Sequence, residues 1–286
     1  MQAEVIAWFE AEGRDLPWRR PGFTAWGSLV SEFMLQQTPV SRVIPKLEEW
    51  LARWPTPAAL AADSPGEAVR AWDKLGYPRR ALWLHACAVA IVERFNGEVP
   101  DDVDELQSLP GIGPYTARAV AVFAFGAHAP VVDTNIRRVI ARHEKGLADQ
   151  GAPREKQDLA DMDALLPKRD LSPVFNQAVM ELGALVCTSK SPACGSCPIS
   201  RSCAWLAAGS PANASGSKPK QKKYEGSDRQ ARGAILAILR GAGRDVTKSE
   251  IDESWPDSVQ RDRALATLLL DGLVVAVEDD RFQLPR

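Results

Sequence analysis

Two carboxylates stand in contrasting sequence surroundings that would let them act as a catalytic pair. Glu32 is the single acid in an apolar helical segment at 28–38, where burial would disfavour its charged form and keep it protonated. Asp133 precedes a helix expected over 135–142, and the N-terminus of that helix would favour the ionised carboxylate. Each residue alone also fits an ordinary structural role, as a core acid or a helix cap. The pair indicates glycosidic bond cleavage, which uses one neutral carboxylic acid and one carboxylate.

Four cysteines follow the pattern C-x6-C-x2-C-x5-C, at Cys187, Cys194, Cys197 and Cys203. Four cysteines so close together in an intracellular chain indicate a metal site rather than disulfides. Four thiolates suit zinc or an iron–sulfur cluster, and the spacing alone leaves both open. The absence of a nearby histidine argues against a mixed Cys/His zinc site. The fifth, Cys87, lies on an apolar helical face, and we expect it to be a small buried side chain.

A glycine-containing turn at 109–113 separates helical stretches expected at 103–108 and 115–125. Gly111 and Gly113 allow a tight turn, and the helix that follows would present free N–H groups to an anion such as a phosphate. An ordinary helix connection would look the same in sequence. The turn is therefore a candidate phosphate site.

The elements that must position these residues are mostly helices. The chain has 286 residues, 45% of them hydrophobic, with a formal net charge of −2, which allows two or three domains. No stretch approaches the roughly 20 apolar residues of a membrane helix. The N-terminal segment carries acids where a signal peptide would be basic and then apolar, so we expect a cytoplasmic protein with no membrane partner.

Short breaks divide the region from 25 to 140 into helices, which predicts a compact helical bundle. Residues 206–225, rich in Ser, Ala, Gly, Pro and Lys, are expected to form a basic linker. The segment 226–286 then has the order of a winged-helix-like domain. Its expected elements are helices at 229–239, 247–254 and 260–270, and strands at 273–277 and 281–284.

Basic residues concentrate locally although the net charge is slightly negative. Between Cys187 and Tyr224 there is no acid, and the cations are Lys190, Arg201, Lys218, Lys220, Lys222 and Lys223. Smaller basic groups are Arg79 with Arg80, and Arg137 with Arg138 and Arg142. These residues could contact DNA or simply be solvated, and composition does not decide between the two.

Five motifs together resemble the adenine DNA glycosylase family of the helix-hairpin-helix, endonuclease III-like superfamily, in its short actinobacterial form. They are LPW at 16–18, SEFMLQQT at 31–38, KLGYPRRA at 74–81, LPGIGPYTARAV at 109–120 and VVDTNIRRVIAR at 131–142. The cysteine spacing after FNQAVMELGALVC resembles the [4Fe–4S] loop of the same superfamily. The resemblance runs from about residue 8 to 203, and for the short actinobacterial enzymes it extends into the C-terminal segment.

The resemblance implies a mostly α fold with a six-helix barrel domain at 22–130 that carries the helix-hairpin-helix. Residues 1–21 and 131–205 would form the iron–sulfur cluster domain. It implies a monomeric base excision repair enzyme that flips adenine out of double-stranded DNA and hydrolyses its N-glycosidic bond. The adenine would be mispaired with 8-oxoguanine or guanine.

The resemblance also assigns roles to individual residues. Glu32 would be the general acid and Asp133 would stabilise the sugar cation or bond to it, with Tyr115 and Asn135 beside them. Gln37 and Thr38 would lie at the opposite base, and Tyr77 would be the wedge that stacks into the duplex. Gly111 and Gly113 would bind a DNA phosphate, together with a possible cation, and Lys190 would reach a second phosphate. The adenine pocket would be formed by Trp18, Arg19 and Gln177.

Tyr115 stands where the lyase endonuclease III has a lysine that forms a Schiff base, and a phenol cannot do this. We therefore expect a monofunctional glycosylase. Two departures from the family pattern are Pro78 in place of a second tyrosine, and the small C-terminal segment in place of the domain that recognises 8-oxoguanine. The alternatives are a thymine or uracil mismatch glycosylase of the same superfamily, and an iron–sulfur DNA-binding regulator.

Overall fold

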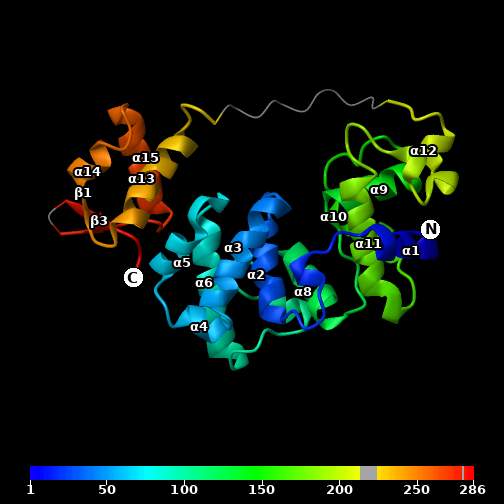
Figure 1. Ribbon diagram of the computed structural model, residues 1–286, viewed down its shortest axis with the longest axis horizontal. Coiled ribbons are helices and arrows are strands. Elements are labelled where there is room, and N and C mark those ends of the chain that lie inside the picture. The colour runs from blue at the N-terminus through cyan, green and yellow to red at the C-terminus, as the bar shows by residue number, and fades with distance from the viewer. Residues whose placement is uncertain (213–223, 279) are drawn as a thin grey trace. The chain divides into compact units, whose positions relative to one another are not determined.

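The computed structural model describes residues 1–212, 224–278 and 280–286 (Figure 1). These residues form two compact units, each assembled from separate parts of the chain. Unit 1 contains residues 1–28, 101–107 and 112–212, and unit 2 contains residues 29–100, 108–111 and 224–286. Lys218, Lys220, Lys222 and Lys223 of the expected basic linker lie outside the described residues. The domain boundaries expected from the resemblance remain predictions.

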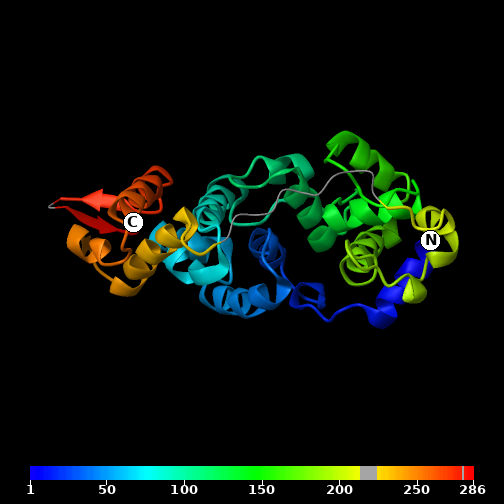
Figure 2. The same ribbon diagram turned by 90° about the horizontal axis from the view of Figure 1, so that it is seen from above.

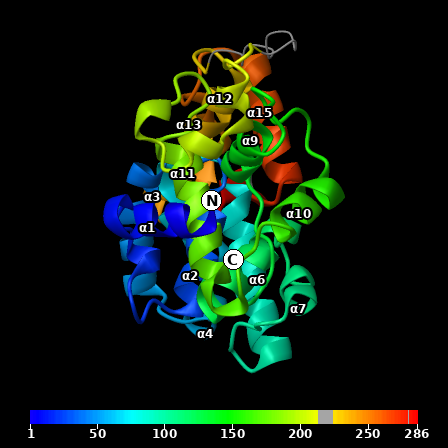
Figure 3. The same cartoon turned by 90° about the vertical axis from the view of Figure 1, so that its right-hand side faces the viewer.

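Unit 1 is built around helix α11 (Ser172–Leu185), against which α1 (Gln2–Glu12) and α9 (Thr134–His143) pack (Figure 3). Its core includes Val5, Ile136, Phe175 and Val179, all fully buried. The other helices are α7 (Val103–Gln107), α8 (Pro114–Phe125), α10 (Glu155–Asp163) and α12 (Ala204–Ala207), with short 3-10 turns at Pro17–Arg19, Arg169–Leu171, Cys194–Ser196 and Ser200–Ser202.

Helix α2 (Ala25–Leu35) runs from unit 1 into unit 2. Unit 2 continues with α3 (Val40–Arg53), α4 (Pro57–Ala61), α5 (Pro65–Trp72), a 3-10 turn at Asp73–Leu75, and α6 (Arg79–Phe95), against which α4 and α5 pack. Thr56 and Ser64 cap the N-termini of α4 and α5, each accepting a backbone N–H with its hydroxyl oxygen. Caps of this kind satisfy N–H groups that have no partner within the helix.

The C-terminal part of unit 2 joins three helices to a small antiparallel sheet (Figure 2). The helices are α13 (Asp228–Ala242), α14 (Lys248–Asp252) and α15 (Ser258–Leu270), and the strands are β1 (Val246–Thr247), β2 (Val275–Val277) and β3 (Arg281–Gln283), in the order β1-β3-β2. Phe282 pairs with Val246 on one side and with Ala276 on the other. The expected three helices and two strands are all present. Strand β1 was not predicted, because two residues are too short to show an alternating pattern.

The expectation of a mostly helical chain is confirmed. Within the described residues, no helix combines the length and the apolar composition needed to cross a membrane.

Candidate active site, hairpin and cysteine loop

Glu32 lies on α2 among side chains that are almost completely enclosed. Its exposed fraction is 9%, and its neighbours Ser31 and Phe33 are at 2% and 0%. The helix ends at Leu35, and Gln37 then adopts a positive φ of 56°. This left-handed residue turns the chain sharply, so that Gln37 is exposed while Thr38 is buried. Non-glycine residues in this conformation are uncommon and concentrate at functional sites.

Arg80, the second residue of α6, ties the proposed wedge to the end of α2. Its Nη1 donates to the carbonyl oxygen of Phe33 at 2.9 Å and also to that of Gln36. Its guanidinium lies 4.9 Å from the centre of the Tyr77 ring. Tyr77 is 52% exposed and has a φ of 48°. Arg80 is itself buried, so its charge serves the local structure rather than a DNA-binding surface.

Gly111 of the hairpin packs directly against the helices of unit 2. Its φ is 76°, and a Cβ atom at this position would meet Cβ of Trp83 at 2.6 Å and the ring of Phe33 at 3.0 Å. Gly113, the N-cap of α8, has a φ of −91°, and a Cβ atom there would meet nothing within 4 Å. The two glycines therefore have different reasons to be glycine: Gly111 is fixed by conformation and packing, whereas Gly113 leaves the helix N-terminus uncovered.

We expect Gly111→Ala to destabilise the protein by about 2–4 kcal/mol, because it adds a strained left-handed residue and an overpacked contact. Affinity for duplex DNA should fall with it, since Phe33 or Trp83 must move. Gly113→Ala is the matched control and should change stability by no more than about 0.5 kcal/mol. Thermal melting and duplex titration of both variants check this. Equal stability losses in the two variants would contradict the packing role assigned to Gly111.

Asp133 caps α9, as the sequence predicted. Its Oδ1 accepts the backbone N–H groups of Asn135 and Ile136 at 2.9 and 2.8 Å, and its Oδ2 accepts Nδ2 of Asn135 at 2.7 Å. We expected the helix N-terminus to favour the ionised form of Asp133 and so to lower its pKa. The net shift of the pKa is in the opposite direction, so this expectation is wrong. Burial raises the pKa of Asp133, and the hydrogen bonds and the nearby Arg138 lower it only in part.

A hydrogen-bonded chain leads from Asp133 to the cysteine loop through Asn135 and Arg138. Oδ1 of Asn135 accepts Nη2 of Arg138 at 2.8 Å. Arg138 in turn donates to the carbonyl oxygen of Cys187 at 2.6 Å and to that of Gly183 at 2.6 Å. Gly183 permits this, because a Cβ there would meet Asn135 at 2.7 Å. The position of the Asp133 carboxylate is thus linked to that of the loop that begins at Cys187.

The segment that leads into Asp133 is held by a buried amide of α11. Oδ1 of Asn176 accepts the N–H of Val131 at 2.8 Å, and its Nδ2 donates to the carbonyl oxygen of Ala129 at 3.2 Å. Tyr115, on α8, packs against the small apolar cluster that contains Val131. Tyr115 and Asp133 are therefore both anchored to the same short segment of unit 1.

Arg142 organises the start of the cysteine loop. Its Nη1 donates to Sγ of Cys187 at 3.3 Å and to the carbonyl oxygen of Thr188 at 2.7 Å. Its Nη2 donates to the carbonyl oxygen of Ser189 at 3.2 Å. Arg137 pairs with Asp158 at 2.8 Å. The guanidinium groups of Arg137, Arg138 and Arg142 therefore all have partners inside unit 1.

The four loop cysteines are free thiols that influence one another electrostatically. Burial raises the pKa of Cys197, the thiols of Cys187, Cys203 and Cys194 add to this effect, and the pKa reaches about 11. Burial likewise raises the pKa of Cys87, to about 12, as expected for a small enclosed side chain of α6. Across residues 1–212, 224–278 and 280–286, no three His, Cys, Asp or Glu side chains are arranged as the ligands of a metal ion.

A buried ion pair that the sequence did not reveal fixes the N-terminal arm onto α11. Glu181, 1% exposed, accepts Nε of Arg14 at 2.7 Å and Nη2 of Arg19 at 2.9 Å. Arg19 also donates to the carbonyl oxygen of Arg14 at 3.1 Å. The Arg19 guanidinium thus has a structural partner. The role of Arg19 in an adenine pocket stays a prediction, and so do the roles of the partly buried Trp18 and Gln177. Lys190 is exposed.

This ion pair predicts a specific acid sensitivity. Burial alone would raise the pKa of Glu181, but the hydrogen bonds from Arg14 and Arg19 lower it to about 2, from an ordinary 4.5. A lowered folded-state pKa gives stability that is present above pH 4.5 and lost as the pH falls toward 2, on the order of 3 kcal/mol in total.

Glu181→Gln should be less stable than the wild type near neutral pH and should lack this part of the acid-dependent loss. Urea unfolding at about pH 7 and about pH 3 measures both quantities. Glu12→Gln, at an exposed glutamate of α1, is the control and should follow the wild type. A Glu181→Gln curve that runs parallel to the wild-type curve would contradict the assignment.

The structure distributes the expected site residues over both units. Unit 2 contains Glu32, Gln37, Thr38, Tyr77 and Gly111, and Arg80 connects the Tyr77 ring to backbone carbonyl oxygens at the end of α2. Unit 1 contains Gly113, Tyr115, Asp133, Asn135, Gln177, Lys190, the loop cysteines, and Trp18 with Arg19. The internal roles of Asn176, Arg138 and Glu181 were missed, because buried polar residues that bind the backbone leave no local pattern in the sequence.

Comparison with known proteins identifies the family. Residues 30–161 match the family described as HhH-GPD superfamily base excision DNA repair protein. An adenine DNA glycosylase of Mycolicibacterium smegmatis is 54% identical over 282 residues, covering 98% of this chain and 94% of the relative. A thymine/uracil-DNA glycosylase of Pyrobaculum aerophilum is 38% identical over 199 residues, covering 68% of this chain and 86% of that protein.

The fold is also that of a solved glycosylase. The structure of a thermostable thymine-DNA glycosylase superposes with a TM-score of 0.66 at 25% identity, covering 72% of this chain and 94% of the other. The expected helix-hairpin-helix glycosylase fold is therefore confirmed.

Proposed function

Because the chain belongs to the adenine DNA glycosylases, base excision repair enzymes that hydrolyse an N-glycosidic bond, we propose that its substrate is adenine opposite 8-oxoguanine or guanine in double-stranded DNA. One observation carries this proposal. The identity to the mycobacterial adenine DNA glycosylases extends over 98% of the chain, including the C-terminal part of unit 2. The identity to the thymine/uracil enzyme covers 68% of the chain at a lower level.

Two carboxyl groups divide the chemistry between them. Glu32, enclosed on α2, donates a proton to the adenine and so makes it a neutral leaving group. Asp133 provides the negative charge that stabilises the sugar cation, and the N–H groups of Asn135 and Ile136 keep its carboxylate in one orientation. Nδ2 of Asn135 donates to Asp133, and Tyr115 packs against the apolar cluster that contains Val131, two residues before Asp133.

The reaction stops at the abasic site, since Tyr115 has no amine to form an imine with the sugar. Borohydride added during the reaction tests this step. We expect no efficient covalent adduct, and an abasic strand that breaks only after alkali. Efficient trapping would mean that an amine elsewhere acts as a lyase.

The opposite base is tested with duplexes that place adenine opposite 8-oxoguanine, guanine, cytosine and thymine. Single-turnover rates should be highest for the first two. Equal rates for all four duplexes would contradict a preference for mispairs while leaving adenine as the target.

We further propose that Cys187, Cys194, Cys197 and Cys203 bind a [4Fe–4S] cluster. The donor set supports it: four thiols in one loop that affect one another's pKa, with Arg142 donating to Sγ of Cys187 and Arg138 to the Cys187 carbonyl oxygen. Two guanidinium groups at this place would offset the negative charge of a thiolate-bound cluster. The cluster would have a structural role, holding the loop that carries Lys190.

Protein purified without oxygen should be brown and contain about four irons per chain. Cys197→Ser should lose the iron and weaken duplex binding, whereas Cys87→Ala, the control in α6, should keep the iron. Stoichiometric zinc without iron in the wild type would overturn the cluster assignment.

A further inference from the structure

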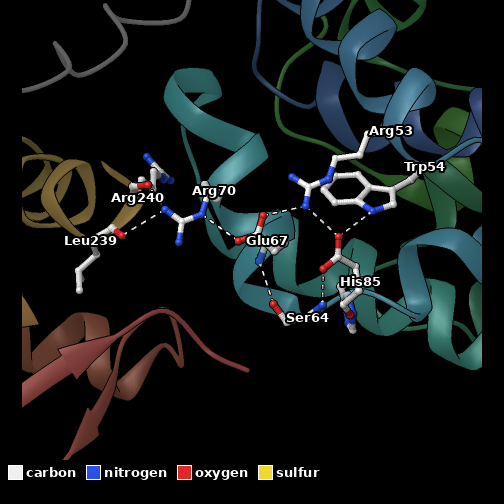
Figure 4. A network of polar contacts seen from close by, with 9 residues as sticks. Arg53, Trp54, Ser64, Glu67, Arg70, His85, Leu239 and Arg240 are labelled. Carbon is white, nitrogen blue, oxygen red and sulfur yellow. Dashed lines mark hydrogen bonds and ion pairs between the residues drawn. The ribbon is translucent and has the colours of Figure 1, made fainter. Parts of the chain in front are cut away.

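The C-terminal part of unit 2 is joined to α5 by direct backbone contacts. The N–H of Gly66 donates to the carbonyl oxygen of Pro285 at 2.7 Å, and a Cβ at Gly66 would collide with that oxygen. Arg70 donates to the carbonyl oxygens of Leu239 and Arg240 at the end of α13 (Figure 4). Nε of Arg240 donates back to the carbonyl oxygen of Val69 at 3.0 Å. Reciprocal contacts of this kind fix α13 against α5.

A second junction connects the end of α15 to the first turn of α6. Asp271 lies directly after α15 and accepts Nη1 of Arg79 at 3.3 Å. The same carboxylate accepts Nη2 of Arg232 at 2.5 Å, and Arg232 also donates to the hydroxyl oxygen of Thr267 at 2.6 Å. Asp271 is thus held by α13 and α15, and it reaches Arg79 from a fixed position.

The first turn of α6 also contacts the parts of unit 2 for which DNA-binding roles are proposed. Arg79 lies 5.2 Å from the ring centre of Trp83, whose Cβ limits the space at Gly111 of the hairpin. The next residue, Arg80, contacts the Tyr77 ring and the carbonyl oxygens at the end of α2. A displacement of this turn would therefore reach the wedge and the hairpin together.

The charge of the C-terminal part argues against a phosphate-binding surface of its own. Residues 226–286 contain nine Lys or Arg and eleven Asp or Glu, a balance of 9 − 11 = −2. Several of the cations are paired with acids of the same part: Arg244 with Glu250, Lys248 with Asp262, Arg261 with Asp252, and Arg263 with Asp228. A region with this balance has no net attraction for polyanionic DNA.

We propose that Asp271 is a positioning residue through which the C-terminal part of unit 2 holds Arg79 and the first turn of α6 in the arrangement that binds the duplex. The C-terminal part then acts on DNA through Tyr77 and Gly111 and not through a basic surface of its own. This inference rests on the DNA-binding roles proposed above for Tyr77 and the hairpin.

The direction in which Asp271→Asn changes duplex affinity separates this positioning role from simple charge repulsion. Removing an acid near DNA should tighten binding, since fewer negative charges face the phosphates. If Asp271 positions the turn, Asp271→Asn should instead weaken binding to an A:8-oxoguanine duplex by about 2- to 5-fold, the range expected for a partly exposed ion pair. Asp262→Asn makes the same charge change on α15 and should not weaken binding.

The experiment is a double-substitution cycle in the full-length protein. Dissociation constants are measured for the wild type, Asp271→Asn, Arg79→Met and the double variant, all with Glu32→Gln so that the duplex stays intact. Asp271→Asn should have no further effect when Arg79 is already replaced, and Asp271→Glu should restore affinity. With active Glu32, adenine release at saturating enzyme should change by less than about 2-fold, as for a residue that affects binding and not chemistry.

Tighter or unchanged binding by Asp271→Asn would overturn the proposal, as would an equal loss with and without Arg79. A fall in melting temperature that Asp271→Glu does not reverse would mean a purely structural role and would also overturn it. The cycle measures dissociation constants only, whereas the proposed function is tested by adenine release. A wild-type protein that released no adenine would refute the proposed function, and that failure can be told apart from a failure of the cycle.

Discussion

The Glu32→Gln variant should bind an A:8-oxoguanine duplex with nearly wild-type affinity and release adenine about 10²- to 10⁴-fold more slowly. Glutamine has almost the same size and shape as glutamate, so the enclosed position on α2 should keep its packing. An amide cannot donate the proton that the leaving base requires. The loss should therefore appear in the single-turnover rate and not in the dissociation constant.

Glu48→Gln is the matched control for this experiment. It makes the same substitution at an exposed glutamate of α3 in the same unit, and its rate should equal that of the wild type. Melting curves of both variants separate a chemical defect from a folding defect. A Glu32→Gln rate within a few-fold of the wild type would show that Glu32 is a core residue and not the general acid.

The Asp133→Asn variant should lower the rate by about 10²- to 10³-fold, because the sugar cation loses the negative charge beside it. Asparagine is also a favourable N-cap, so the helix α9 should remain intact. The raised pKa of Asp133, caused first by its burial, predicts a second property. The carboxylate becomes protonated at a higher pH than an ordinary aspartate does, and the activity should fall on the acid side at a correspondingly higher pH.

The same pKa shift has the opposite consequence for stability. A raised folded-state pKa favours the protonated form on folding, so its contribution is present below the ordinary pKa and is lost as the pH rises through the folded one. Asp257→Asn, at the N-cap of α15 where Asp257 accepts the N–H of Gln260 at 2.9 Å, tests capping alone. If Asp133→Asn behaved like Asp257→Asn, with altered stability and full activity, Asp133 would be only a cap.

Local patterns predicted those parts of the site that depend on local geometry. The cap at Asp133, the left-handed turn at Gly111 and the enclosure of Glu32 all follow from a few neighbouring residues. The raised pKa of Asp133 could not be predicted in this way, because the burial of Asp133 depends on the whole of unit 1. A carboxylate at a helix N-terminus can therefore have its pKa raised even though the cap hydrogen bonds lower it.

Contacts between distant segments could not be predicted from sequence pattern. Glu181 pairs with Arg14 across 167 positions, and Arg70 contacts Arg240 across 170. Each arginine resembles an ordinary surface cation when only its neighbours in sequence are considered. The junction of Asp271 with Arg79 is of the same kind. It connects the C-terminal segment to α6, a contact that the winged-helix-like order of its elements did not predict.

Identification of the base released by the wild-type protein tests the central claim most directly. The enzyme, in excess, is incubated with duplexes carrying A:8-oxoguanine, A:G, T:G or U:G, and the free base is identified by chromatography. We predict free adenine from the first two duplexes and neither thymine nor uracil from the others. Release of thymine or uracil without adenine would contradict the account and assign the chain the chemistry of the thymine/uracil relatives.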